Sequence, residues 1–528
     1  MAGSWRLFES KQSASHPQTA ISVRQKKVHI VIVVISLFIC VETLLAGLYY
    51  VVRIPPQELF FFAALGLIVL YGLVLWSWYT LTQELFDPYI LFFSAAFLFN
   101  AGVSILILQP SGNHNYGGAW EIFTSFRESD IFDGLFLVLV SLTAFHMGAL
   151  SSLLTAKGML QVENNRSFAY ANALRVVGMS LIVVSAIPTA LRLREFATIA
   201  NRFGYQGLYL ESASYSSGLF AILTSLFVTG ILFLLAGSKG KKMSIALSMV
   251  LMGVYVGIYL SIGIRNKAVM PLIAYVWVWH KIIKPLPKAF LFSCGFVMLF
   301  FIFPLLRFTR NSTASEIQNV FQLWEIYRDI DNSVIATIGE MGKSIETIIY
   351  TMQFVPKNRG FELGGTYVNS LLVVIPNLFW DTQPASVNRL SFWLVEQVYP
   401  SNYLVVAGHG WTIGYSFIAE AYLNFGWLGS IVCLAVIGSL FVRFVLWGRQ
   451  DIQKIATVAA FLPYFLFFSR EESLNLTRSL LYYSVIPYFL VLLVHSGVGV
   501  KRRLSANRHR IVEVDDYDSD KRVRSPFK

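Results

Sequence analysis

The sequence predicts an all-α polytopic membrane protein with about twelve transmembrane helices, and three observations support this fold class. Hydrophobic residues make up 55% of the 528 residues and charged residues only 14%, whereas soluble domains usually have about a quarter charged residues. The apolar residues form blocks of about 20, the length that crosses a hydrocarbon core of about 30 Å. Basic residues gather in alternate loops between the blocks, so the net charge of +12 indicates membrane topology rather than nucleic-acid binding.

The predicted spans fall into two membrane domains separated by one long loop. The spans cover roughly 28–52, 57–80, 89–108, 133–155, 173–193, 217–236, 243–263, 268–283, 289–306, 414–447, 455–469 and 479–496. About nine of them form a membrane domain over 28–306, and about three form another over 414–496. The loop between the domains covers 307–413. A basic segment, 1–27, precedes the first span, and a charged tail, 497–528, follows the last.

The distribution of charge predicts the orientation of the chain. With the N-terminus in the cytoplasm, the loops on that side contain most of the lysine and arginine, as the positive-inside rule requires. These residues are Lys239, Lys241, Lys242, Lys281, Lys284, Lys288, Arg443, Arg449 and Lys454. The cytoplasmic loop around Glu84 and Asp87 contains no basic residue and is the exception. An even number of spans places both termini in the cytoplasm and the 307–413 loop on the outer face.

The outer loop is too long for a simple turn, and long loops are usually functional. Apolar residues at helical spacing within 324–350 predict one or two amphipathic helices that lie over the membrane surface. Glycines and prolines punctuate the apolar segment 361–384, which predicts a short re-entrant helix. The loop also contains Asp329-Ile330-Asp331, the acid-x-acid pattern of many metal-dependent glycosyltransferases. We interpret this pattern as a solvated helix face, because nucleotide sugars are not supplied on the outer side.

Residues 408–429 contain polar side chains that are unexpected at a membrane boundary. Ser416, Glu420 and Asn424 recur every four residues, so on a helix they share one face. A carboxylate at membrane depth is costly and usually faces a wet cavity or a polar partner. The alternative interpretation is a helix-packing stripe. His409, between two glycines, is either a general base that titrates near neutral pH or an ordinary loop residue.

Arginines gather at the ends of spans on the predicted outer face, against the positive-inside trend. Arg265 ends the seventh span, and Arg307 and Arg310 end the ninth. Guanidinium groups make planar, bidentate contacts with phosphate oxygens, so these arginines are predicted to bind the diphosphate of an anionic lipid. The alternative explanation is that they reach outward to the lipid headgroups.

A family resemblance connects these features. The stretches GGTYVNSLLVVIPNLFWDTQP and GHGWTIGYSFIAEAYLNFGWLG, followed by a span, resemble the Wzy-type polymerases of bacterial surface polysaccharides. The likeness is strongest over about 361–430, and its most specific residues are Ser416, Glu420, Asn424, Phe425 and Gly426. The resemblance implies a GT-C-like membrane glycosyltransferase that polymerises undecaprenyl-diphosphate-linked repeat units of O-antigen, capsule or exopolysaccharide. The reaction would take place at the outer face of the bacterial inner membrane.

The resemblance and the residue chemistry together suggest three groups of site residues. They are Glu420 and His409 as base or acceptor-orienting groups, Arg265, Arg307 and Arg310 on the diphosphate, and Tyr367, Trp411 and Tyr415 stacked on sugar rings. Arginines can neutralise the leaving diphosphate, so neither a metal nor a cofactor is expected. The expected partners are lipid-linked donor and acceptor glycans and membrane lipids, with a chain-length regulator as a further candidate and no nucleic acid.

Two other functions fit parts of the pattern. An O-antigen ligase would use similar chemistry, and a flippase or transporter of lipid-linked sugars would share the many spans. Transporters often have repeated halves and broken helices near the membrane midplane. In this sequence the polar features gather in one outer loop and at the outer ends of spans, which favours an enzyme.

Overall fold

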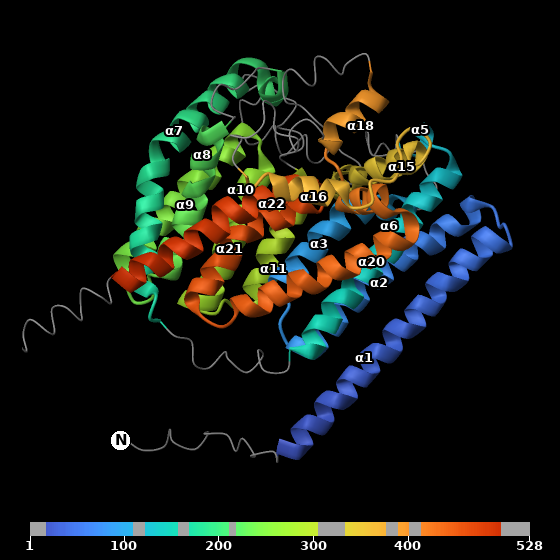
Figure 1. Cartoon of the computed structure of the whole chain (residues 1–528), viewed down its shortest axis with the longest axis horizontal. Coiled ribbons are helices and arrows are strands. Elements are labelled where there is room, and N and C mark those ends of the chain that lie inside the picture. The colour runs from blue at the N-terminus through green and yellow to red at the C-terminus, as the bar shows by residue number, and fades with distance from the viewer. Residues whose placement is uncertain are drawn as a thin grey trace, which may run out of the picture.

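The computed structural model describes residues 17–108, 122–156, 168–210, 218–304, 333–375, 389–400 and 413–497. Every regular element in these ranges is a helix. The helices form one bundle, with α1 (Pro17–Ala46) running along its edge (Figure 1). The prediction of an all-helical protein is therefore confirmed for the described part of the chain.

Seven of the described helices are long and apolar enough to cross a membrane. They are α1 continued by η1 (Gly47–Val51), α2 (Pro56–Thr82), α6 (Glu128–Thr155), α7 (Ala171–Leu210), α9 (Lys242–Ile262), α20 (Phe417–Gly448) and the run Ser473–Gly497, which starts with α22 (Ser473–Leu480) and η7 (Leu481–Val485). This arrangement is expected of a polytopic membrane protein.

The remaining predicted spans lie over shorter helices. These are α3 (Pro88–Ala101), α8 (Gly218–Ala236), α10 (Arg265–Val278) continued by η4 (Trp279–Ile283), α11 (Lys288–Val297) continued by η5 (Met298–Ile302), and α21 (Ile452–Phe468). Each predicted segment thus overlaps a helix, although only seven helices meet the length and hydropathy of a full span. The count of about twelve spans stays a prediction.

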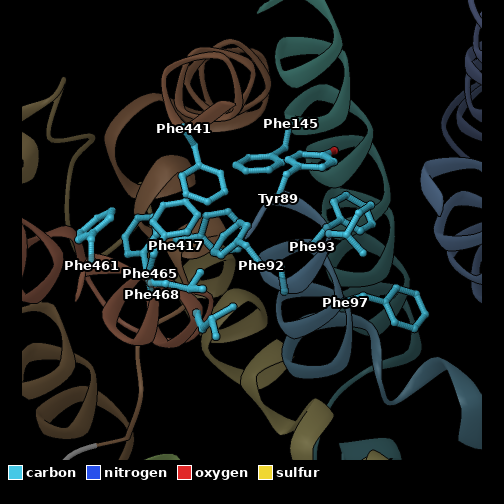
Figure 2. Packing of buried hydrophobic residues seen from close by; sticks show 14 of the residues in the cluster. Tyr89, Phe92, Phe93, Phe97, Phe145, Phe417, Phe441, Phe461, Phe465 and Phe468 are labelled. Carbon is cyan, nitrogen blue, oxygen red and sulfur yellow. The ribbon is translucent and has the colours of Figure 1, made fainter. Parts of the chain in front are cut away.

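Aromatic rings fill the centre of the bundle (Figure 2). Phe465 of α21 stacks on Phe441 of α20 with ring centroids 3.6 Å apart, and lies 4.1 Å from Phe92 of α3. The Phe92 ring in turn lies 5.2 Å from that of Phe145 on α6. Offset and tilted ring pairs of this kind contribute beyond the apolar area that they bury. The cluster therefore holds α3, α6, α20 and α21 together.

Helices α6 and α20 approach one another closely because glycines lie between them. A Cβ atom added at Gly148 of α6 would overlap the backbone oxygen of Ala435, and one added at Gly438 of α20 would overlap that of Phe145. Small residues at a helix interface let two backbones approach within a membrane, where lipid provides no hydrophobic drive for association. Ser152 Oγ of α6 also lies 2.7 Å from Ser439 Oγ of α20.

We expect Gly148→Leu to lower the free energy of unfolding by more than about 2 kcal/mol, because the added side chain forces α6 away from α20. The measurement is the thermal midpoint of the detergent-solubilised protein. The matched control is Gly257→Leu on α9, where an added Cβ meets nothing within 4 Å. Equal midpoints for the two variants would contradict this account of the interface.

An ion-pair network closes one end of the bundle. Asp87, which caps α3 through a 2.9 Å hydrogen bond from the Tyr89 N–H, is fully buried and pairs with the guanidinium of Arg449. Glu84 pairs with Lys281 and lies 3.5 Å from Arg449 Nη2. The loop around Glu84 and Asp87, which has no basic residue of its own, is thus neutralised by Lys281 and Arg449. These two residues come from other loops that the sequence places on the cytoplasmic side. A buried carboxylate needs such partners.

The long loop contributes several short helices to the opposite end. They are α14 (Ser333–Met341), α15 (Ile345–Phe354), α16 (Gly365–Leu372) and α18 (Leu390–Val398), of which α15, α16 and α18 are labelled in Figure 1. The apolar face of α15, with Ile345, Ile348 and Ile349, is buried and α15 packs against α6. Helices α14 and α15 lie over the described part of the segment 324–350, which was predicted to form amphipathic helices. Helix α18 had no counterpart among the predicted elements.

Candidate functional site

The site is centred on Glu420, which lies one turn into α20. The helix begins after Ser416, whose Oγ accepts a hydrogen bond of 3.2 Å from the Ile418 N–H. The Ser416 hydroxyl itself donates to Asn100 Oδ1 of α3 at 2.6 Å. Ser416 is therefore an N-cap outside the helix, and the prediction that it shares a helical face with Glu420 is wrong. Asn424 does lie one turn beyond Glu420, and its Nδ2 donates to the Glu420 backbone oxygen at 2.8 Å.

The carboxylate of Glu420 is almost fully buried, with 1% of the residue exposed, and accepts three hydrogen bonds. Thr366 Oγ1 donates to Oε1 at 2.8 Å, and Ser473 Oγ donates to the same oxygen at 2.6 Å. The Ser473 backbone N–H donates to Oε2 at 2.7 Å. Such bonds are stronger than those between neutral groups and offset part of the cost of burial. One carboxylate thus connects α20, α16 and α22.

Asn424 holds the segment before α16 in place. The backbone N–H groups of Leu363 and Gly364 donate to the backbone and side-chain oxygens of Asn424, each at 3.0 Å. Its Nδ2 also donates to Thr366 Oγ1 at 2.7 Å. Gly364 has a φ of +92°, which permits the sharp entry into α16. Asn424 therefore positions Thr366, and through it one of the donors to Glu420.

Helix α20 breaks directly after this polar group. Gly426 has φ 65° and ψ −159°, a backbone conformation that is essentially restricted to glycine. A Cβ at this position would lie 3.2 Å from Cζ of Phe361. The break separates a short buried segment that carries Glu420 from the long lipid-facing part of α20. The glycine of the Asn424-Phe425-Gly426 pattern is therefore explained by the backbone conformation at the break.

A small cavity of about 130 Å³ lies beside Glu420. Its lining is mostly polar and includes Arg359, Glu362, Asn369, Glu420, Glu472 and Ser473. Sugar hydroxyls both donate and accept hydrogen bonds, so carboxylate and amide side chains are suitable ligands for them. The prediction that Glu420 faces a cavity or a polar partner is confirmed, because it does both.

The charged groups of the cavity are already organised by their neighbours. Arg359 contacts Glu362 Oε1 with Nε and Nη2, each at 2.8 Å, and lies 4.8 Å above the Trp393 ring. Glu472 Oε2 accepts a 2.7 Å hydrogen bond from the Leu390 N–H, at the start of α18. Burial raises the pKa of the Glu472 carboxyl, and the hydrogen bond from Leu390 opposes that shift. With three carboxylates and one guanidinium, the cavity is acidic.

Arg265 is the first residue of α10 and lies at the same end of the bundle as Glu420, outside the cavity lining. The first turn of α10 also carries Lys267, which interacts electrostatically with Glu471 in the turn between α21 and α22. That glutamate precedes Ser473 by two residues. Burial raises the pKa of the Glu471 carboxyl, and the positive charge of Lys267 opposes the rise. Arg192 of α7 is also close enough to interact with Lys267.

The two described tyrosines predicted to stack on sugars are packed against protein groups. The Tyr415 hydroxyl lies 2.9 Å from Thr351 Oγ1, and only 1% of the residue is exposed. Its ring therefore presents no face to a sugar in this structure. The Tyr367 ring stacks with that of Phe425 at 6.3 Å, and its Oη accepts from Cys433 Sγ at 3.4 Å.

Four predicted site residues lie outside the described residues, namely Arg307, Arg310, His409 and Trp411. Their roles stay predictions. Within the described ranges, no group of three or more His, Cys, Asp or Glu side chains is placed to hold a metal ion.

Sequence reasoning missed most of the residues that surround Glu420. Thr366 lies in the predicted re-entrant segment, but nothing in the sequence pairs it with a residue 54 positions later. Ser473 is the first residue of a span, and a serine at that position is usually interpreted as a helix cap rather than as a site residue. The spacing of Arg359 and Glu362, three residues apart and just before two glycines, was the one local signal of an ordered ion pair.

Comparison with known proteins gives one match. The family model described as O-antigen polysaccharide polymerase Wzy matches residues 29–503, nearly the whole chain. No curated protein and no solved structure matches the chain.

Proposed function

The chain belongs to the O-antigen polysaccharide polymerase Wzy family, and we propose that it joins oligosaccharide repeat units carried on undecaprenyl diphosphate. The reaction takes place at the outer face of the bacterial inner membrane and builds a surface polysaccharide. The observation that carries this proposal is the polar cavity beside Glu420, at the end of a helical bundle and next to a break in α20. A carboxylate in a polar cavity at the end of a span is suited to act on a sugar hydroxyl close to the membrane surface.

In the proposed reaction, a hydroxyl of the acceptor sugar attacks the anomeric carbon of the donor sugar. The new glycosidic C–O bond forms as the bond from that carbon to the lipid diphosphate breaks. Glu420 takes the proton from the attacking hydroxyl, which is the role of a general base. Glu420 Oε1 accepts from the hydroxyls of Thr366 and Ser473, whereas Oε2 accepts one hydrogen bond, from the Ser473 N–H, so Oε2 keeps a lone pair for the acceptor hydroxyl.

The leaving diphosphate gains negative charge as the bond breaks. We propose that Arg265 stabilises this charge, with Arg307 and Arg310 in support. Lys267 in the same turn of α10 and the nearby Arg192 add positive charge at this end of the bundle. Preorganised cations aimed at developing charge are usually the largest single contribution to catalysis. The arginines can therefore do the work that a metal ion does in other glycosyltransferases.

Charge supports the proposed orientation. The end of the bundle opposite the cavity contains Lys281 and Arg449, which the sequence assigns to cytoplasmic loops. The excess of lysine and arginine near that end agrees with the positive-inside rule. With that end in the cytoplasm, the Glu420 cavity faces outward, where the lipid-linked repeat units are displayed after transfer across the membrane.

The test is reconstitution of the full-length protein in phospholipid vesicles with the purified undecaprenyl-diphosphate-linked repeat unit of its own bacterium. We expect a ladder of glycans that grows by whole repeat units and remains attached to the lipid carrier. Transfer of glycan to lipid A core would instead indicate a ligase. Movement of the repeat unit across the bilayer without growth would indicate a flippase. Either result would overturn the proposal.

A further inference from the structure

A cluster of aromatic rings lies next to the break in α20, and the proposed chemistry does not use it. We call it the aromatic surface, and it consists of Tyr50, Phe136, Phe361, Tyr422 and Trp427. The rings come from η1, α6, the segment before α16, and both sides of Gly426 in α20. Four separate parts of the chain therefore meet at one surface.

Trp427 occupies the centre of this surface. Its ring centroid lies 6.1 Å from that of Phe136, 6.3 Å from Tyr422 and 6.4 Å from Tyr50. The Tyr422 and Tyr50 rings stand nearly perpendicular to it, at 87° and 83°. Tyr50 is 49% exposed and Phe361 is 40% exposed, whereas Phe136 and Tyr422 are buried and support the exposed rings. The rings thus support each other by edge contacts while part of the surface remains open.

A carboxylate lies at the edge of the aromatic surface. Asp133 of α6 accepts a 2.7 Å hydrogen bond from the Tyr50 hydroxyl on Oδ1. Aromatic faces stack on the apolar C–H face of a sugar ring, and a neighbouring carboxylate accepts hydrogen bonds from sugar hydroxyls. An aromatic belt that only anchors a protein in lipid would direct its hydroxyls to the headgroups. Here Tyr50 directs its hydroxyl to Asp133, and a carboxylate against lipid would be costly.

One segment of the chain connects the aromatic surface with the Glu420 cavity. The segment before α16 runs beside α20, where the Glu362 N–H donates to the Leu423 oxygen at 3.1 Å. Glu362 lines the cavity, whereas the preceding side chain, Phe361, contacts Tyr422 with ring centroids 6.2 Å apart. Adjacent residues of one segment thus face the cavity and the aromatic surface. A glycan that extends out of the cavity past Phe361 would meet Trp427 next.

We propose that the aromatic surface binds the growing glycan chain beside the catalytic cavity. This inference rests on the proposed polymerase function and adds a holding site for chains longer than one repeat unit. Retention of the chain near Glu420 between transfers would favour further growth over release. The aromatic surface would therefore govern the length of the product.

The test compares Trp427→Ala with wild type, both as full-length protein in phospholipid vesicles. One readout is the chain-length distribution made from the lipid-linked repeat unit. The other is the binding of lipid-free fragments of the bacterium's own surface polysaccharide, a few repeat units long. We expect weaker fragment binding by about tenfold and a shift to shorter chains for Trp427→Ala. Asp133→Asn, which keeps the shape of the side chain but removes its charge, should shift both readouts in the same direction.

Three controls make the result decisive. Trp427→Phe keeps a ring and should retain most of the binding. Asp133→Asn carries the test alone if the alanine variant fails to fold. Trp76→Ala removes a partly exposed tryptophan of α2, outside the aromatic surface, and should leave both readouts unchanged. Wild-type binding and chain lengths in both Trp427→Ala and Asp133→Asn would overturn the inference. Failure of the wild-type protein to make any ladder would instead count against the polymerase function itself.

Discussion

Replacement of Glu420 by glutamine is expected to slow chain elongation by roughly 100-fold or more, the lower range of what a general base contributes. Glutamine can keep the hydrogen bonds that surround the side chain. Its amide oxygen can accept from the Ser473 N–H, and its NH₂ group can donate to the hydroxyls of Thr366 and Ser473, which also act as acceptors. The variant should therefore fold, but it cannot take the proton of the acceptor hydroxyl. The measurement is the initial rate of glycan growth in reconstituted vesicles.

Two further variants separate catalysis from structure at this position. Ser473→Ala removes one donor from Glu420 Oε1 but keeps the carboxylate and the backbone N–H, so growth should continue. Glu420→Ala removes both the base and the connection between α16, α20 and α22, so it should lose both growth and thermal stability. Wild-type growth by Glu420→Gln would show that Glu420 serves only to hold the helices together. His409 would then be the next candidate for the base.

Most of the fold was predictable because membrane helices leave strong local signals. A run of about 20 apolar residues must form a helix in lipid, where every backbone polar group needs an internal partner. The predicted segments therefore coincide with helices such as α2 and α6. Helix α18 was missed because it is only nine residues long and lies in a loop. Its first N–H is satisfied by Glu472, a residue 82 positions away that no local pattern could assign.

The site was predictable only in part, because a sequence shows local signals but does not show which distant residues come into contact. An acid in an apolar segment is a local signal, and it correctly marked Glu420 as a residue with a cavity and polar partners. The identity of those partners depends on tertiary contacts between α16, α20 and α22. The predicted helical face that contained Ser416 was wrong because a serine whose Oγ accepts from the N–H two residues later caps the start of a helix instead of lying within it. Helical periodicity alone does not distinguish these two outcomes.

Replacement of Arg265 by alanine is the second change expected to stop chain growth while the protein still inserts. The arginine is the first residue of α10, at the same end of the bundle as Glu420. Loss of a group that stabilises developing charge typically costs about 10²–10³ in rate. We expect a loss of that size in the growth rate of reconstituted vesicles. Arg265→Lys should recover only part of it, because a lysine keeps the charge but cannot contact two phosphate oxygens with one planar group.

A matched arginine distinguishes a specific diphosphate contact from general attraction to lipid. Arg194 is exposed and lies on α7, two residues after Arg192. Arg194→Ala should leave the growth rate within about twofold of wild type, since exposed charges are well screened at physiological salt. If Arg265 only anchors α10 at the headgroups, Arg265→Ala and Arg194→Ala will behave alike, and Arg265→Lys will recover full activity. A specific role requires the opposite pattern, in which position 265 needs an arginine and position 194 tolerates its loss.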